Sequence, residues 1–169
     1  MKMREIRFLA IFLISVLINS CVTTTLKPPI IIRDSSFEEY RYVVIQQTGI
    51  LTSGTASVYG GQYGLYGSSS SKSINPSDVI SGILMKEGFI ILPEIQPELI
   101  DKTLIVNYGE SGRRDVAFGY TIEVTIKFIS AMSYEIIASC TAEGMGSTEV
   151  DDIRIAINRC LSGLFQNEN

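Results

Sequence analysis

The sequence predicts an α+β fold, a two-layer sandwich in which an antiparallel sheet of about four to five strands carries two helices on one face. Apolar residues alternate along several consecutive segments in the second half of the chain, and in two other segments they recur at helical spacing. The length of 169 residues suits one domain of ordinary size. A hydrophobic share of 46% against 19% charged residues excludes a largely disordered chain.

The first half of the predicted domain begins with a strand and an insertion. Residues 40–45 are rich in aromatic and β-branched side chains, which favour a strand. Residues 49–73 are rich in glycine, serine and tyrosine and hold too few aliphatic residues for a core of their own, so they predict a loop-like insertion. Residues 50–58 could extend as one arm of a hairpin before the glycines begin.

A helix is predicted after this insertion. Asn75 or Ser77 can cap its first turn, and proline and aspartate at the next positions suit a helix start. Gly88 stands where a left-handed C-cap belongs. The apolar run 89–92 then predicts a short buried strand that ends at Pro93.

The second half predicts strands over residues 103–108, 116–129 and 134–142, with a polar turn at 109–115. Residues 116–129 alternate most clearly, which indicates one buried and one solvated face. A last helix follows. Thr148 and Asp151 resemble a capping box, acidic residues crowd its first turn, and an apolar stripe runs from Val150 to Leu164.

The first residues of the chain predict a targeting segment. Basic residues at positions 2, 4 and 7 precede the apolar run 8–18, which is too short to span a bilayer as a helix. The run ends in Leu17-Ile18-Asn19-Ser20-Cys21, which resembles the lipobox of bacterial lipoproteins. Ile18 matches the aliphatic position and Ser20 the small position before cleavage, whereas Asn19 departs from the usual smaller residue.

This resemblance implies that residues 1–20 are a signal peptide and that Cys21 carries acyl chains such as palmitate. Residues 21–36 would then form a lipidated tether, and residues 37–169 a single domain. Position 22 is valine rather than aspartate, and no acidic cluster follows Cys21 directly. By the family's sorting patterns, both features favour the outer membrane with the domain facing the periplasm.

Composition excludes several function classes. The chain has 14 basic and 18 acidic residues, a net charge of −4, which argues against a nucleic-acid partner. It has no histidine, which excludes Ser–His–Asp and Cys–His catalysis. No metal-ligand spacing appears, and the Gly144–Gly146 and Lys72–Ser73 segments lack the remaining glycines of nucleotide-binding loops. We therefore predict no catalytic residue, no metal and no cofactor.

Three groups of residues remain as candidate functional features. Arg113 and Arg114 lie in the predicted polar turn, which is either a solvated turn or a contact for an anionic group or partner. Tyrosines in the insertion provide contact area at low entropic cost, unless the insertion is simply a surface loop. These are Tyr59, Tyr63 and Tyr66.

The two remaining cysteines form the third group. Cys140 lies in an alternating strand and Cys160 on the apolar side of the last helix. In an oxidising compartment they either form a disulfide or remain two buried thiols.

The leading functional hypothesis is a lipid-anchored, non-enzymatic binding or assembly-accessory module of the bacterial envelope. Its partners would be the membrane, reached through Cys21, and an envelope protein or cell-wall material. Two alternatives stay open. One is a hydrolase of cell-wall material that uses a pair of carboxylates. The other is a structural protein that associates with itself through an exposed strand edge.

Overall fold

The structure is a computed structural model that describes residues 25–47, 50–61, 64–117 and 119–166. The predicted signal peptide, the lipobox with Cys21, and Tyr63 lie outside these residues. Along the chain the elements are β1 (Ile30–Arg33), β2 (Tyr42–Ile45), β3 (Leu51–Gly61), β4 (Gly64–Ile74), α2 (Pro76–Lys86), β5 (Ile90–Leu92), the 3₁₀ helix η1 (Pro97–Lys102), β6 (Thr103–Val116), β7 (Gly119–Ser130), β8 (Ile136–Gly144) and α3 (Glu149–Gln166).

The main sheet has six strands in the order β1-β8-β7-β6-β2-β5, and β3 and β4 form a separate two-stranded sheet. Strand β2 is parallel to both β5 and β6, whereas the other pairs of the main sheet are antiparallel. The predicted antiparallel sandwich of four to five strands is therefore wrong, since the fold is β-rich and its large sheet is mixed. The parallel pairs arise because the connections from β2 to β5 and β6 are long enough to bring the chain back in the same direction.

The added strand β1 comes from the predicted tether. The sequence of residues 21–36 predicts an extended tether and no strand. In the structure, Ile30–Arg33 nevertheless pair with Ala138–Thr141 of β8. Since an edge strand needs only one partner, four residues are enough to extend the sheet. The folded body thus begins before residue 37.

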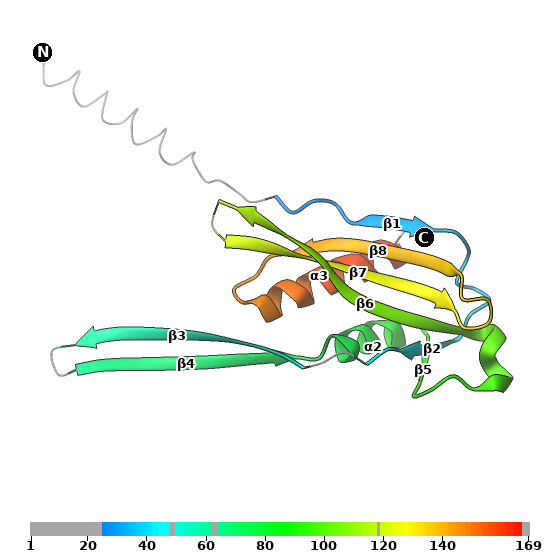
Figure 1. Ribbon diagram of the computed structural model, residues 1–169, viewed down its shortest axis with the longest axis horizontal. Helices are drawn as coiled ribbons and strands as arrows, with labels where there is room; N and C mark the ends of the chain where they lie inside the picture. Colours follow the sequence, from blue (N-terminus) through cyan, green and yellow to red (C-terminus); the bar gives the residue numbers. More distant parts are fainter. Residues whose placement is uncertain (1–24, 48–49, 62–63, 118, 167–169) are drawn as a thin grey trace, which may run out of the picture.

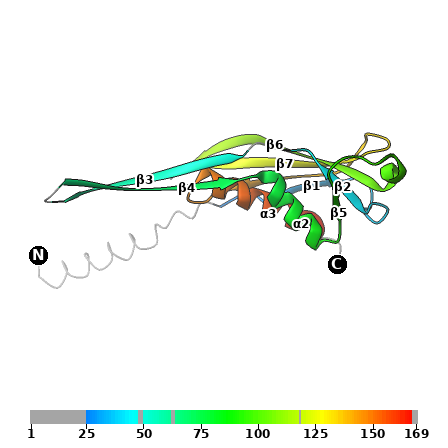
Figure 2. The same ribbon diagram turned by 90° about the horizontal axis from the view of Figure 1, so that it is seen from below.

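Both helices pack on the same side of the main sheet (Figure 2). Helix α3 lies against β7 and β8, and α2 lies against α3. On β7, Ile122, Val124, Ile126 and Phe128 are fully buried beneath the helices. Glu123, Thr125 and Lys127 alternate with them and remain partly or fully exposed. Neither helix lies on this second side (Figure 2), and we name its part around Glu123, Thr125 and Lys127 the open face of the sheet.

The predicted loop-like insertion is a long β-hairpin. Strands β3 and β4 pair from Leu51↔Ile74 to Gly61↔Gly64 and project beyond the main sheet (Figure 1). Glycine and serine have low strand propensity, which is why their composition predicted a loop. At its base, Lys72 contacts Asp151 at 2.7 Å and Ser53 accepts a hydrogen bond from the backbone of Val150 at 3.2 Å.

The capping residues predicted from the sequence lie at the ends of α2 and α3. The Asn75 side chain accepts a hydrogen bond from the backbone N–H of Ser77, at 3.3 Å, and caps α2. The backbone N–H of Asp151 donates to Thr148 Oγ1 at 3.2 Å, and Gly88 has φ of +93° after α2. Within the described residues, no helix is long and apolar enough to cross a membrane.

The predicted polar turn at 109–115 is instead part of strand β6. A register shift between Glu110 and Gly112 marks a bulge, and the pairing with β7 continues to Val116↔Gly119. The predicted strand 116–129 is therefore interrupted by the chain reversal that follows Val116. A bulge absorbs one extra residue without ending the ladder, so charge density alone could not distinguish it from a turn.

Candidate functional site

A cluster of charged residues holds the start of the described chain, which we name the neck (residues 25–27), against one end of the open face. Its centre is Glu143 in β8, whose side chain is only 3% exposed. Arg114 in β6 donates two hydrogen bonds to this carboxylate, from Nε at 2.8 Å and from Nη2 at 2.6 Å. The backbone N–H of Lys27 donates a third at 3.1 Å.

Further contacts bind the neck from two other directions. Arg159 of α3 donates to the Lys27 carbonyl oxygen at 2.7 Å and also to the Glu143 carbonyl oxygen. Arg114 Nη2 lies 3.5 Å from the Thr25 carbonyl oxygen. The hydrogen bonds from Arg114, and then that from the Lys27 backbone, lower the pKa of Glu143 to about 2 against the opposing effect of burial. The neck is therefore held to β6 and β8 through the ionised Glu143 carboxylate, and to α3 through Arg159.

Arg113, the second arginine singled out by the sequence, is also engaged within the chain. Its guanidinium pairs with Glu149 at the start of α3, lies 3.5 Å from Glu110, and sits 5.3 Å from the centre of the Tyr120 ring. Both arginines thus lie in strand β6 rather than in a turn, and both pair with carboxylates, although the Arg113 side chain remains half exposed. The sequence could not identify their acidic partners, because Glu143 and Glu149 are 29 and 36 residues away.

The start of α3 packs very closely against β8. A Cβ atom on Gly144 would overlap the backbone of Asp152 and lie 2.7 Å from the Ala156 nitrogen. One on Gly146 would lie 2.6 Å from the Asp151 Cβ. The glycines that superficially suggest a nucleotide-binding loop therefore allow close helix–strand packing.

The acidic residues of this turn are occupied by the fold. Asp151 accepts hydrogen bonds from Lys72, Ser147 and Thr148, and these lower its pKa. Burial raises the pKa of Asp152, which accepts a hydrogen bond from the Gly146 backbone. Both carboxylates thus accept hydrogen bonds from within the fold.

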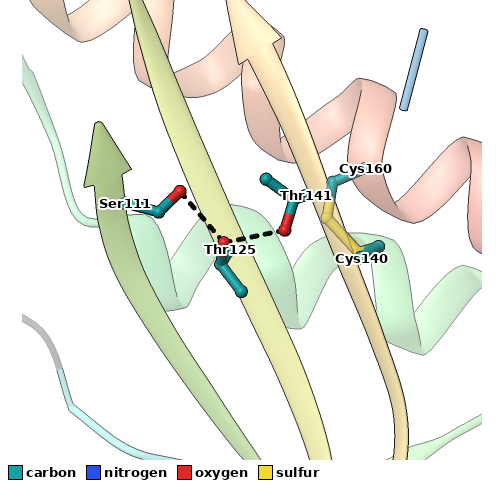
Figure 3. Close-up of a disulfide and its surroundings, with 5 residues drawn as sticks. All are labelled: Ser111, Thr125, Cys140, Thr141 and Cys160. Carbon is teal, nitrogen blue, oxygen red and sulfur yellow. Dashed lines mark hydrogen bonds between the residues drawn. A yellow bond between two sulfur atoms is a disulfide. The ribbon is translucent and has the colours of Figure 1, made fainter. Parts of the chain in front are cut away.

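Cys140 and Cys160 form a disulfide, with an S–S distance of 2.04 Å and a Cα–Cα distance of 5.4 Å (Figure 3). Both residues are fully buried. The bridge joins β8 to α3 on the helix side of the sheet. It resolves the choice between a bridge and two free thiols that the sequence leaves open.

On the other side of the same strands, hydroxyl groups form a hydrogen-bonded row across the open face. Thr125 Oγ1 lies 2.8 Å from Thr141 Oγ1 and donates to Ser111 Oγ at 3.0 Å (Figure 3). Ser111 in turn donates to Glu123 at 2.8 Å. These groups come from β6, β7 and β8, so the row crosses three adjacent strands.

A cavity of about 320 Å³ adjoins this row. It is lined by Asn107, Tyr108, Gly109, Glu110, Ser111, Thr125 and Lys127. Asn107 Oδ1 is buried and accepts no hydrogen bond from the described residues. Because a buried polar atom without a partner is unfavourable, this oxygen is a ready acceptor for an incoming donor.

Sequence reasoning missed Asn107, Ser111 and Thr125 as candidate residues. The available signal was the polar side of the alternating strand 116–129, which locates Thr125 and Lys127 on one face. Neighbouring polar residues from other strands become visible only once the register is known.

Two of the three tyrosines singled out in the insertion lie in the described part of the hairpin. Tyr59 and Tyr66 are register partners in β3 and β4. Their position places them near the end of the hairpin that is farthest from Asp151. Among the described residues there is no group of three or more histidine, cysteine or acidic residues that could hold a metal ion.

Neither protein-family models nor curated proteins match this chain. Among solved structures, it is similar to a dodecamer of a PelC variant from Paraburkholderia phytofirmans. The sequence identity is 12% and the TM-score is 0.44, over 82% of this chain and 96% of the PelC chain.

Proposed function

We propose that this protein is a lipid-anchored lipoprotein of the bacterial envelope and acts as a non-enzymatic binding or assembly-accessory module. Its membrane attachment is Cys21, and its location is the outer membrane with the folded body facing the periplasm. The lipobox-like sequence supports the anchor, and valine at position 22 supports the location. The described carboxylates at the start of α3 are engaged by the fold, which favours binding over hydrolysis.

The observation that carries this proposal is the open face itself. One side of the sheet is buried beneath α2 and α3, whereas the other presents a row of hydroxyls and a cavity with the unpartnered Asn107 Oδ1. Hydroxyls, an amide, Lys127 and Glu123 together offer donors and acceptors on a rigid sheet, as a polar binding surface requires. The partner class is an envelope protein or cell-wall material.

Photo-crosslinking in cells tests this surface. A photoreactive amino acid at Lys127, on the open face, is compared with one at Glu94, an exposed position after β5. We expect a discrete adduct from position 127 in the membrane fraction and none from position 94. Digestion of the adduct with protease or with a cell-wall hydrolase assigns the partner class. Identical adduct patterns from both positions would contradict a role for the open face.

Self-association through a strand edge is a second candidate, supported by β1. Within the part of the chain that the structure describes, this strand pairs with β8 alone, and it exposes two isoleucines, Ile30 at 61% and Ile32 at 64%. Unpaired edge backbone next to apolar side chains is a site where another strand can add. Sedimentation over a concentration series should show an oligomer that Ile32→Lys disrupts. A monomer at all concentrations would eliminate this candidate.

A further inference from the structure

We propose that the β3–β4 hairpin lies against the lipid surface to which Cys21 is anchored, so that the protein contacts the membrane at a second site. This inference rests on the proposed lipid anchor and extends it by naming the surface that faces the bilayer. Four observations support it: the short stretch of chain between Cys21 and the neck, the direction of the hairpin, the contacts at the hairpin base and the uncharged composition of the hairpin.

The first step is the short reach of the anchor. Cys21 and Thr25 are four residues apart, which spans at most about 14 Å of extended chain. From Thr25 onward, Arg114, Glu143 and Arg159 hold the neck on the body. The end of the sheet that carries the neck must therefore stay close to the membrane.

The second step is the direction of the hairpin. Both views show it projecting past the same end of the molecule at which the described chain begins (Figures 1 and 2). Each of its strands has 11 residues, or about 36 Å of extended chain. This length exceeds the reach of the anchor, so the hairpin is long enough to contact the lipid surface while Cys21 holds the body.

The third step is the attachment of the hairpin at its base. Lys72 pairs with Asp151 at 2.7 Å, and Ser53 accepts a hydrogen bond from the Val150 backbone at 3.2 Å. Both partners belong to the first turn of α3, the helix that also supplies Arg159 to the neck. The hairpin and the neck are thus fixed to one helix and keep their relative direction.

The fourth step is composition. Residues 51–71 contain no charged residue, so their approach to a bilayer requires no charge to lose its hydration. The two strands include Tyr59 and Tyr66, and tyrosine is enriched where membranes meet water. The two strands bond to each other and leave their outer backbone groups without strand partners in the described residues. Such groups favour the hydrated headgroup region over the hydrocarbon core.

Site-specific fluorescence on the full-length, lipidated protein in liposomes tests the contact. The chain has three cysteines. With Cys21 acylated and Cys140 bonded to Cys160, an introduced cysteine is the single reactive thiol. One variant carries an environment-sensitive dye at Ser69→Cys in β4. The matched control carries it at Glu94→Cys, in the loop after β5 at the opposite end of the molecule (Figure 1).

We expect nitroxide groups on the lipid headgroups to quench the dye at position 69 several-fold more strongly than the dye at position 94. Equal quenching at both positions, with the protein still bound to liposomes, would overturn the hairpin contact and leave the anchor intact. Shielding of position 69 only after an envelope extract is added would assign the hairpin to a protein partner and overturn the proposal as well.

The anchor is measured separately, by intact mass and by flotation with the liposomes. A chain that carries no acyl group on Cys21 and does not float would refute the proposed function itself. The failure of the anchor is thus distinguishable from the failure of the hairpin contact.

Discussion

Replacing Glu143 by glutamine should weaken the folded state, because this carboxylate holds the neck. Its side chain is 3% exposed and receives hydrogen bonds from Arg114 at 2.6 and 2.8 Å and from the Lys27 backbone at 3.1 Å. Glutamine keeps the shape of the side chain and removes its charge. The charge-assisted hydrogen bonds from Arg114 would become ordinary ones, which are about half as strong.

The magnitude follows from the pKa of Glu143, which falls from 4.5 to about 2. At about 1.4 kcal/mol for each pKa unit, the folded state would gain about 3 kcal/mol from the ionised form. The side chain of Arg114 is 35% exposed and that of Lys27 61%, so solvent screens both partners. We therefore expect Glu143→Gln to lower the free energy of unfolding by about 1–2 kcal/mol at neutral pH.

The pH dependence has a defined sign. Because folding lowers this pKa, the stabilisation is fully present above the unfolded value of about 4.5, decreases as the pH falls, and is lost below about 2. The measurement is urea unfolding of the unlipidated Cys21→Ser chain, followed by circular dichroism at several pH values. Glu94→Gln, at an exposed position, is the matched control. A difference between wild type and Glu143→Gln that stays constant from neutral pH to about pH 2 would refute the electrostatic argument.

Two further changes test the packing of α3 on β8. Replacing both Cys140 and Cys160 by serine opens a bridge between residues 20 apart and should cost about 3 kcal/mol, measured as a lower urea midpoint. An unchanged midpoint would show that the bridge adds nothing. Gly144→Ala should destabilise by several kcal/mol, since its Cβ would overlap the Asp152 backbone, whereas Gly82→Ala in α2 meets nothing within 4 Å and should preserve or raise the melting temperature. Equal melting temperatures for the two alanine variants would contradict the close approach.

The sequence predicted features that depend on neighbouring residues. Asn75 caps α2, and Thr148 with Asp151 begins α3, because a cap is formed by side chains within one turn of the helix. The alternation around Ile122 to Phe128 identified the buried and polar sides of β7, because strand geometry directs consecutive side chains to opposite faces.

Features that depend on distant residues were not predicted. Ile30–Arg33 becomes a strand only because β8 supplies its partner more than 100 residues later. The parallel pairing of β2 with β6 depends on the crossover between them, and crossovers leave no periodicity in the strands themselves. Of the hairpin, only residues 50–58 were considered as one arm. Its second strand was missed because the pairing is stabilised by backbone hydrogen bonds, which composition does not report.

The candidate site shows the same division. The sequence identifies Arg113 and Arg114 as a pair of neighbouring charges. Their ion-pair partners, Glu149 and Glu143, belong to α3 and β8 and are brought to them by the fold. Asn107 carries no distinguishing signal in the sequence, and Thr125 only its place on the polar side of a strand. They become a site because adjacent strands bring them to one cavity. Residue type could identify the charge, but only the sheet register could identify the partner.

Helix α3 connects the features on which both proposals depend. Arg159 contacts the neck, the first turn of α3 receives Lys72 and Ser53 of the hairpin, and the Cys140–Cys160 bridge ties the same helix to β8, which supplies Glu143. Loosening α3 would therefore disturb the neck and the hairpin together. The open face depends on β6, β7 and β8 and lies on the other side of the sheet, so its hydroxyl row should persist. We therefore expect the variant with serine at both Cys140 and Cys160 to lose more of the lipid quenching of the dye at position 69 than of the crosslinking from position 127. Equal losses in the two assays would show that α3 does not couple the anchor to the hairpin.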